Sequence, residues 1–420
     1  MKSLSFILCV LLVTSCQQDV NHQTDDKGVA VATPYFWKKA LHKNDIVYNG
    51  RLFTPIYYKN GILIPMTDGE SHIFSLINAD NGKTLWEWDD QFFPKRDNSI
   101  DFYCQNQNLL AFQDGSRSYC LNMGNGSTFW KYERDRSFRG EMGISGDKYY
   151  NVGPIYSDDG TEMAAFVGDI KSGENITPKI RMDFPNDIDY PEGAWGPKYK
   201  GGVIYLNTVP DDEKLLLVSH HVVRENWLTF DTYFSLYNVE TEDWIWKNKS
   251  IFEEYPMTFY FEPVIKYGKI YANVGTSLVC HDIVTGKQIW VKNFNGNFFF
   301  TGYIIEDGKV IANNEDTNMY ALNAETGAQL WSTPTAGTSS RMSYLNGVVY
   351  MVGGSGGGRL FAIEAATGKM LWRIDAGLLG EGYGARFRTN AVYVLPARDD
   401  KPAKVTALSN LYAYCFKAER

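Results

Sequence analysis

The sequence predicts an all-β fold, an eight-bladed β-propeller whose blades are four-stranded antiparallel sheets. One hairpin motif returns at regular intervals: "DIVTGKQIW" begins at residue 282, "NAETGAQLW" at 323 and "EAATGKMLW" at 364. An alternating apolar segment typical of a strand precedes each copy. Short strands that recur about every forty residues indicate a propeller, because each repeat supplies one blade. Two tandem β-sandwiches would not require one motif to return throughout the chain.

The hairpin occurs in four more places, and six of the seven copies have a glycine at the turn. The other copies are "NADNGKTLW" (78–86), "NMGNGSTFW" (122–130), "DIKSGENIT" (169–177) and "NVETEDWIW" (238–246). A three-residue hairpin loop needs a left-handed residue at this point, and glycine adopts that conformation without steric cost. Glu242 occupies the position in the copy at 238–246, so we expect a strained backbone there.

Eight further β-rich runs are one more than the hairpins require. We assign one run to each blade, as its second strand, before the strand that opens the hairpin: "GILIP" (61–65), "LLAF" (109–112), "YYNV" (149–152), "GVIYL" (202–206), "GKIYANV" (268–274), "GKVIA" (308–312), "GVVYM" (347–351) and "AVYVL" (391–395). The eighth blade then has a third strand at "NLYAYCF" (410–416) and no fourth strand after it. "PYFWKKAL" (34–41) reads as a fourth strand without a blade. We therefore expect this N-terminal strand to complete the last blade and close the ring.

Tryptophan ends most of the hairpins. The set is Trp37, Trp86, Trp130, Trp246, Trp290, Trp331 and Trp372. On the outermost strand of a blade, a buried ring of this size covers about 150–250 Å². We expect these side chains to pack against the neighbouring blade, as core residues and not as ligands.

The N-terminus reads as an export signal. Lys2 and the apolar run from Leu4 to Val13 precede "VTSC", which matches a bacterial lipobox with Cys16 as the lipidated residue. A plain secretory signal with an incidental Cys16 is the alternative. We expect a lipoprotein signal peptide at 1–15, a flexible tether at 16–28 and a single propeller domain at 29–420. The protein is then anchored in a bacterial cell envelope, as an outer-membrane lipoprotein whose membrane face is left open.

Composition excludes some partners and cofactors. The net charge of −8 argues against a broad nucleic-acid footprint. Cys104 and Cys120 fall on the first and third strands of one blade, too far apart for a disulfide. We expect these two cysteines, and also Cys280 and Cys415, to be free and mostly buried thiols. His220 and His221 are adjacent on an alternating strand and point to opposite faces, so they cannot share a metal. No short catalytic or metal-binding motif is present, and we expect no cofactor and no metal.

The hairpin pattern, A-x-[DNE]-x-x-T-G-x-x-x-W, resembles the repeat of the PQQ-like β-propeller family over residues 34–416. The resemblance implies the propeller fold. The family includes non-enzymatic assembly lipoproteins of the outer membrane and large enzymes that bind pyrroloquinoline quinone above the central channel. Those enzymes have longer chains and a pair of adjacent cysteines, which this sequence lacks.

The two rims of the predicted propeller differ. What we call the turn rim holds the TG turns and the hairpins between first and second strands. The loop rim holds the second-to-third-strand connections and those between blades, and its loops mix aromatic residues with arginines, a composition typical of interfaces. Residues 207–231 and 396–409 read as insertions on this rim. The candidate partner-binding residues are Phe92, Phe93, Arg136, Phe138, Arg139, Tyr255, Phe259, Phe298 and Phe299. The alternative is that these aromatics fold back over the blades.

We therefore expect a membrane-tethered, non-enzymatic scaffold that binds an envelope protein through its loop rim. The alternative is a propeller that binds or cleaves glycans, since such sites have no short motif. A quinoprotein dehydrogenase is the least favoured function. Whether any loop is catalytic stays open.

Overall fold

The computed structural model consists almost entirely of β-sheet. It describes these residues: 35–42, 55–67, 72–93, 102–114, 116–133, 142–158, 160–186, 190–191, 198–210, 212–224, 227–259, 261–294, 302–354, 358–381, 386–388 and 392–419. Within these ranges the one named helix is the short 3-10 helix η2 (Ala376–Leu379). The all-β prediction is therefore confirmed. The predicted signal peptide, the tether and Cys16 lie outside the described residues.

Five antiparallel sheets each take four strands that are consecutive in the chain. In chain order they are β2 (Tyr57–Tyr58), β3 (Gly61–Thr67), β4 (His72–Asn78) and β5 (Thr84–Trp88); β6 (Phe102–Asn106), β7 (Leu109–Asp114), β8 (Arg117–Asn122) and β9 (Thr128–Glu133); β18 (Val264–Lys266), β19 (Lys269–Val274), β20 (Ser277–Asp282) and β21 (Gln288–Asn293); β22 (Tyr303–Glu306), β23 (Lys309–Asn313), β24 (Asn318–Asn323) and β25 (Gln329–Pro334); β26 (Ser343–Leu345), β27 (Val348–Gly353), β28 (Arg359–Glu364) and β29 (Met370–Asp375).

A sixth four-stranded sheet joins the two ends of the described chain. It contains β30 (Tyr393–Leu395), β31 (Lys404–Leu408), β32 (Tyr412–Lys417) and β1 (Tyr35–Ala40). Strand β1 pairs antiparallel with β32 and is the outermost strand. The predicted pairing of the N-terminal strand with the last sheet is thus present.

The remaining eight strands form one continuous sheet, where two separate blades were predicted. They are β10 (Gly143–Ser145), β11 (Lys148–Ser157), β12 (Gly160–Asp169), β13 (Asn175–Ile180), β14 (Tyr199–Val209), β15 (Asp212–Val223), β16 (Phe230–Asn238) and β17 (Asp243–Tyr255). Strand β12 pairs in parallel with β14, which links the group β10–β13 to the group β14–β17. Gly202 makes this approach possible, because a Cβ there would overlap the carbonyl oxygen of Met163.

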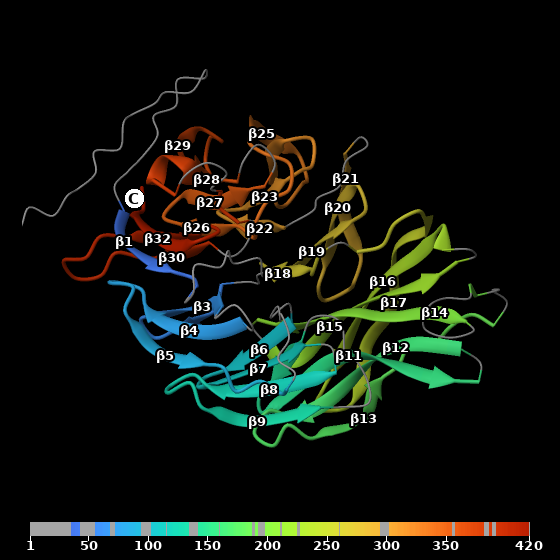
Figure 1. The fold of residues 1–420 in the computed structure, drawn as a ribbon. Helices are drawn as coiled ribbons and strands as arrows, with labels where there is room; N and C mark the ends of the chain where they lie inside the picture. Colours follow the sequence, from blue (N-terminus) through green and yellow to red (C-terminus); the bar gives the residue numbers. More distant parts are fainter. Residues whose placement is uncertain are drawn as a thin grey trace, which may run out of the picture.

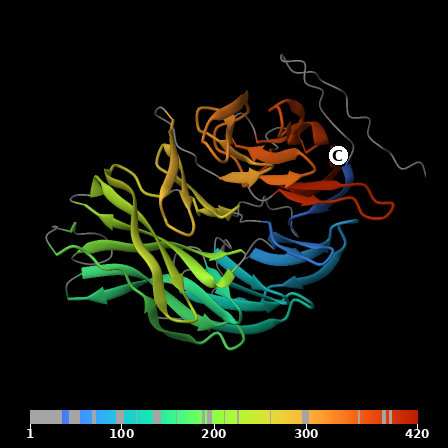
Figure 2. The same cartoon turned by 180° about the vertical axis from the view of Figure 1, so that it is seen from behind.

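The sheets follow one another around a common centre, from the first sheet in blue to the last in red (Figure 1), and the reverse view shows the same order (Figure 2). The last sheet contacts the first. The Tyr393 hydroxyl on β30 donates to the Leu63 carbonyl on β3, and Lys404 Nζ on β31 lies 2.8 Å from Asp80 Oδ1. Residues of both sheets share one apolar cluster, which includes Ile62 of β3 and Leu395 of β30.

The tryptophans of the outermost strands bind the next sheet along the chain. Trp86, Trp130 and Trp290 are buried, and their indole nitrogens donate to the carbonyls of Met123, Ile170 and Ala324 at distances of 2.8–3.0 Å. The corresponding bonds of the other four are Trp37 to Ala79, Trp246 to Ile283, Trp331 to Ala365 and Trp372 to Glu419 Oε2. Each ring therefore secures the hairpin of its neighbour, apart from Trp372, which reaches the C-terminal segment.

Two of the predicted strand assignments are wrong. "GVIYL" lies in β14 and "AVYVL" ends in β30, and both are first strands of their groups where second strands were predicted. The second strands are β15 and β31, which fall inside the supposed insertions at 207–231 and 396–409. The connections before β15 and β31 are therefore on the turn rim. The expectation that these two insertions lie on the loop rim is therefore wrong.

Candidate partner-binding surface

The structure describes four of the nine predicted rim residues. Phe92 and Phe93 follow β5, Tyr255 ends β17, and Phe259 lies just beyond it. The other five candidates, Arg136, Phe138, Arg139, Phe298 and Phe299, lie outside the described residues.

Phe259 belongs to the core, which corrects the prediction that it faces a partner. Its side chain is 6% exposed and packs with Phe234, and the residue bridges to Val274. Tyr255 is half-buried: its ring stacks on Phe252 at 4.7 Å, and its hydroxyl is 3.0 Å from Thr276 Oγ1. At these two positions the aromatic side chains fold back onto the sheets, as the alternative interpretation of the sequence expected.

Phe93 is presented to solvent from a backbone that is held in place. Its side chain is 90% exposed, which is unusual for a residue of this size. The buried guanidinium of Arg117, from the start of β8, donates to the carbonyls of Phe92 at 3.3 Å and of Phe93 at 3.5 Å. Arg117 Nε is in turn 3.0 Å from Glu133 Oε1. These bonds hold the backbone of the segment in place while the Phe93 ring stays exposed.

Phe92 anchors the same segment from the other side. Its ring lies 5.8 Å from that of Tyr119, and the cationic groups of Arg117 and Lys131 lie 5.8 and 5.2 Å from its centre. Both distances are within the range of a cation–π contact. Lys131 also forms an ion pair with Asp90 at 2.5 Å. No sequence pattern points to Arg117, since an arginine at the start of a third strand matches no recognisable motif.

A second exposed apolar site lies on the connection between β15 and β16, again on the loop rim. Leu228 is 68% exposed and Trp227 39% exposed. The Trp227 ring stacks on Tyr199 with 4.9 Å between ring centres and 9° between planes. Arg224 and the buried Asp231 form an ion pair at the base of the connection. Trp227 and Leu228 fall within the predicted insertion at 207–231, but no sequence pattern marks either of them as exposed.

The histidines and thiols have structural roles. Burial lowers the pKa of His220 to about 3 and of His221 to about 4, so both rings are neutral at physiological pH. They bond to Ser235 and Thr258 respectively, each at 3.0 Å. The four cysteines after Cys16, namely Cys104, Cys120, Cys280 and Cys415, are free and buried, as predicted. Among the described residues no group of three or more acidic, histidine or cysteine side chains is arranged to hold a metal ion.

No helix in the described part of the chain has the length and apolar character needed to cross a membrane.

Part of the sequence matches a known family model. The sequence model described as the outer membrane protein assembly factor BamB matches residues 235–376. This stretch contains four of the seven hairpins. The match supports the PQQ-like β-propeller repeat family for this part of the chain. The three copies of the hairpin outside the matched stretch also have turn glycines, and their φ values of 68–74° give the predicted left-handed conformation.

Solved structures of similar fold include proteins with very different activities. BamB from Moraxella catarrhalis is 13% identical, with a TM-score of 0.57, over 93% of this chain and 99% of that one. The quinohemoprotein alcohol dehydrogenase from Comamonas testosteroni is 11% identical, with a TM-score of 0.61, over 91% of this chain and 76% of that one. The computationally designed protein Ika8 is 13% identical, with a TM-score of 0.58, over 90% and 99%. At such identities the likeness shows the propeller fold alone. No curated protein sequence matches the chain.

Proposed function

We propose that the protein is a non-enzymatic scaffold of the bacterial cell envelope that binds a protein partner through its loop rim. The observation that carries the proposal is the presentation of Phe93, 90% exposed on a backbone that Arg117 holds. Central aromatic residues of this kind dominate many interfaces, and their truncation costs about 1–4 kcal/mol of binding. The match to the BamB family model supports an assembly role.

The proposal includes a closed ring of eight blades. We count the groups β10–β13 and β14–β17 as two blades that share one parallel pairing. The bonds between the first and last sheets support closure, and a rigid closed scaffold fixes the loop-rim residues relative to one another.

The proposal also includes a lipid anchor at Cys16. Replacing Cys16 by Ala should release the protein from membranes, because the anchor is the acyl chains that this cysteine would carry. A variant that still sedimented with membranes after a high-salt wash would show that lipid is not the anchor or that a bound partner retains it.

Site-specific photocrosslinking in intact cells tests the partner surface. A photoreactive amino acid would be placed at Phe93, at Leu228 and, as a matched control, at Val284 in the turn between β20 and β21. Val284 is 73% exposed and apolar but lies on the turn rim. We expect positions 93 and 228 to crosslink to the same envelope protein and position 284 not to do so. Equal crosslinking from position 284, or none from position 93, would refute the loop rim as the binding surface.

A glycan-binding function is the second candidate, and one observation favours it. The exposed Trp227 ring is held parallel to Tyr199, with 9° between the two planes, and a sugar ring could stack on such a fixed aromatic face. Calorimetry with envelope glycan fragments, on the parent and on Trp227→Ala, distinguishes this function from the first. Glycan binding that Trp227→Ala abolishes would favour the glycan function, whereas protein crosslinking from position 93 without glycan binding favours the scaffold.

Enzymatic quinone chemistry is not part of the proposal. The six cysteines of the chain stand at positions 9, 16, 104, 120, 280 and 415, so no two are adjacent. The similar alcohol dehydrogenase is also longer, since the match leaves about a quarter of it uncovered.

A further inference from the structure

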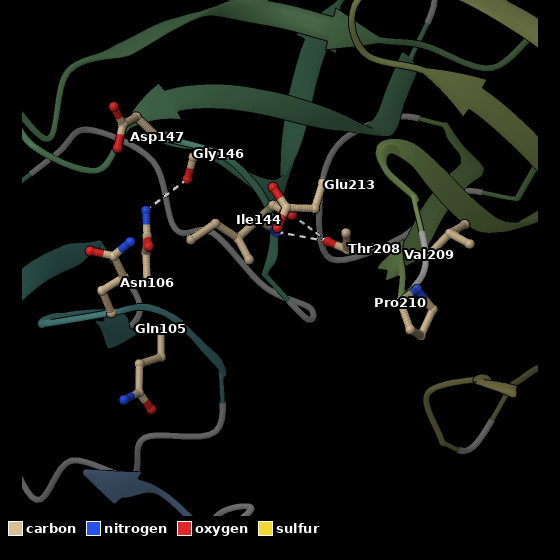
Figure 3. A pocket seen from close by; sticks show the side chains of 10 residues that line it. Gln105, Asn106, Ile144, Gly146, Asp147, Thr208, Val209, Pro210 and Glu213 are labelled. Carbon is tan, nitrogen blue, oxygen red and sulfur yellow. Dashed lines mark hydrogen bonds between the residues drawn. The ribbon is translucent and has the colours of Figure 1, made fainter. Parts of the chain in front are cut away.

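The turn rim contains a pocket where the sequence predicted little specific surface. Its volume is about 470 Å³, which is within the range of small-molecule sites. Three successive hairpins between first and second strands line it: Gln105, Asn106 and Gln107 at β6–β7; Ile144, Gly146 and Asp147 at β10–β11; and Thr208, Val209, Pro210 and Glu213 at β14–β15 (Figure 3).

The pocket exists because the β14–β15 hairpin is longer than its equivalents. Leu215 pairs with Asn238 at the place where Lys269 pairs with Asp282 in the next sheet, so the residues of β15 before Leu215 are additional. This extension is fixed to the neighbouring hairpin. Thr208 Oγ1 accepts from the Ile144 amide at 3.2 Å and donates to its carbonyl, and Ser145 Oγ donates to the Glu213 carbonyl at 2.5 Å.

Protein groups already use two of the side-chain donors of the pocket. Asn106 Nδ2 donates to the Gly146 carbonyl at 2.8 Å, and Gln105 Nε2 donates to the Tyr57 carbonyl at 3.1 Å. Each of these amides keeps a carbonyl oxygen as an acceptor. The pocket therefore suits a ligand that donates hydrogen bonds.

The charge of the lining also favours a ligand that donates hydrogen bonds, and in particular a cation. Among the described residues, the lining contains two carboxylates and neither lysine nor arginine. Asp147 forms an ion pair with Lys171, which lies outside the pocket. The Glu213 carboxylate is exposed and has no ion-pair partner within the described part of the chain. Figure 3 shows Glu213 and Thr208 close to Ile144, with Asn106 beside Gly146.

The apolar part of the lining consists of Ile144, Val209 and Pro210. These side chains suit the aliphatic stem of a cationic group, which buries its methylenes and keeps its charge near acceptors. A sugar site would be expected to offer an aromatic ring, and the part of the lining that the structure describes contains none.

We propose that this pocket binds a guanidinium or alkylammonium group on an aliphatic stem, with the Glu213 carboxylate as its counter-charge and the Asn106 and Gln105 amide oxygens as acceptors. The overall charge of −8 favours the approach of such cations. The site lies on the rim opposite the proposed protein partner and does not depend on that proposal.

Calorimetry and NMR titration of the purified protein test the site. The probes are agmatine, a short arginine peptide and the same peptide with uncharged citrulline in place of arginine. Glu213→Gln removes the counter-charge, and Gln107→Glu adds a carboxylate at an exposed turn position. Glu174→Gln is the matched control, because Glu174 is an exposed glutamate on the same rim outside the pocket.

We expect both charged probes to bind and the citrulline peptide not to bind. Glu213→Gln should weaken binding by about threefold, as an exposed ion pair allows. Gln107→Glu should strengthen it, Glu174→Gln should leave it unchanged, and binding should weaken between roughly 20 and 200 mM salt. If the arginine peptide binds more tightly than agmatine, the site is assigned to a side chain of a partner. If the two bind equally, the site is assigned to a free small cation. The proposal is wrong if citrulline binds as well as arginine, if Glu213→Gln has no effect, or if no probe binds at concentrations up to about 20 mM.

Discussion

The indole ring of Trp86 lies directly against the turn glycine Gly126 of the next sheet. A Cβ built on Gly126 would lie 2.6 Å from the Cδ2 and Cε3 atoms of the ring, too close for any side chain. The same relationship joins Trp37 to Gly82, and Trp290 to Gly327. The glycine therefore satisfies two requirements at once, a left-handed backbone and room for the ring of the neighbouring sheet.

Gly126→Ala should destabilise the fold by more than its backbone conformation alone explains. Its φ of 73° costs alanine about 1–2 kcal/mol, and displacing the Trp86 ring adds to this. Gly146→Ala is the matched control, because its φ is 58° but a Cβ there meets nothing within 4 Å. Denaturant unfolding of both variants should show the larger loss for Gly126→Ala. Equal losses would mean that the ring contact contributes nothing.

Glu242 and Thr177 indicate that the turn glycine and the tryptophan of the preceding group depend on each other. Glu242 replaces the turn glycine and does adopt the left-handed conformation expected of that position, with a φ of 56°. The hairpin before it, in β13, ends in Thr177 where other copies have tryptophan. Where no ring has to be accommodated, a side chain at the turn is tolerated, and Glu242 forms an ion pair with Lys179 of β13. Parallel pairing of β12 with β14 joins the two groups instead.

The sequence predicted the hairpins and their spacing well because turn chemistry and alternation are local. It failed where the outcome depends on contacts between distant strands. "GVIYL" and "AVYVL" look like any second strand, and only their partners show that they are first strands. The burial of Phe259 and the bracing of Phe93 by Arg117 also depend on residues far away in the chain. Local patterns contain no information on either point.

The buried cysteines should not react with a thiol reagent in the native protein. All four described cysteines are buried, and burial raises the pKa of Cys120 and of Cys280 to about 12 and that of Cys415 to about 11. Since the thiolate is the reactive form, a chain that starts at residue 29 should not react with a thiol reagent at about pH 8 until it unfolds. In denaturant four thiols per chain should react. Rapid labelling of the native protein would show that a sheet opens locally or that a thiol is exposed.

Glu381 should make the protein less stable as the pH rises above the ordinary pKa of glutamate. Burial raises the pKa of its carboxyl group, which accepts a hydrogen bond from Ser409 Oγ at 2.6 Å. Because the pKa is raised in the folded state, the contribution of this group is fully present below the ordinary pKa of glutamate, about 4.3, and is lost as the pH rises through the raised value. Glu381→Gln stays neutral and keeps the acceptor. Its melting temperature should exceed that of the parent more at about pH 7.5 than at about pH 4.5.

Glu174→Gln serves as the control for this experiment, since Glu174 is exposed and should change neither value. An equal shift for Glu381→Gln at both pH values would show that the carboxyl group is not desolvated in the folded protein.

The N-terminal strand should stabilise the fold far more than an ordinary terminal segment. Strand β1 pairs with β32, with Trp37 opposite Cys415. The Trp37 ring is 8% exposed, donates to the Ala79 carbonyl at 3.2 Å and covers Gly82 of the first sheet. Loss of a buried tryptophan alone costs about 3–5 kcal/mol, and removal of the strand also leaves the edge of β32 unpaired.

Three chains isolate this effect. A chain that begins at residue 42 should have a melting temperature well below that of a chain that begins at residue 29. A chain that begins at residue 17 should have the same melting temperature as the one that begins at residue 29, since residues 17–28 are expected to be a tether. A synthetic peptide of residues 29–41, added to the shortest chain, should restore much of the lost stability by re-forming the β1–β32 pairing. The same peptide with Trp37→Ala should restore less, because it re-forms the strand without the ring. A shortest chain that melts within a degree or two of the longer ones would refute closure of the ring by this strand.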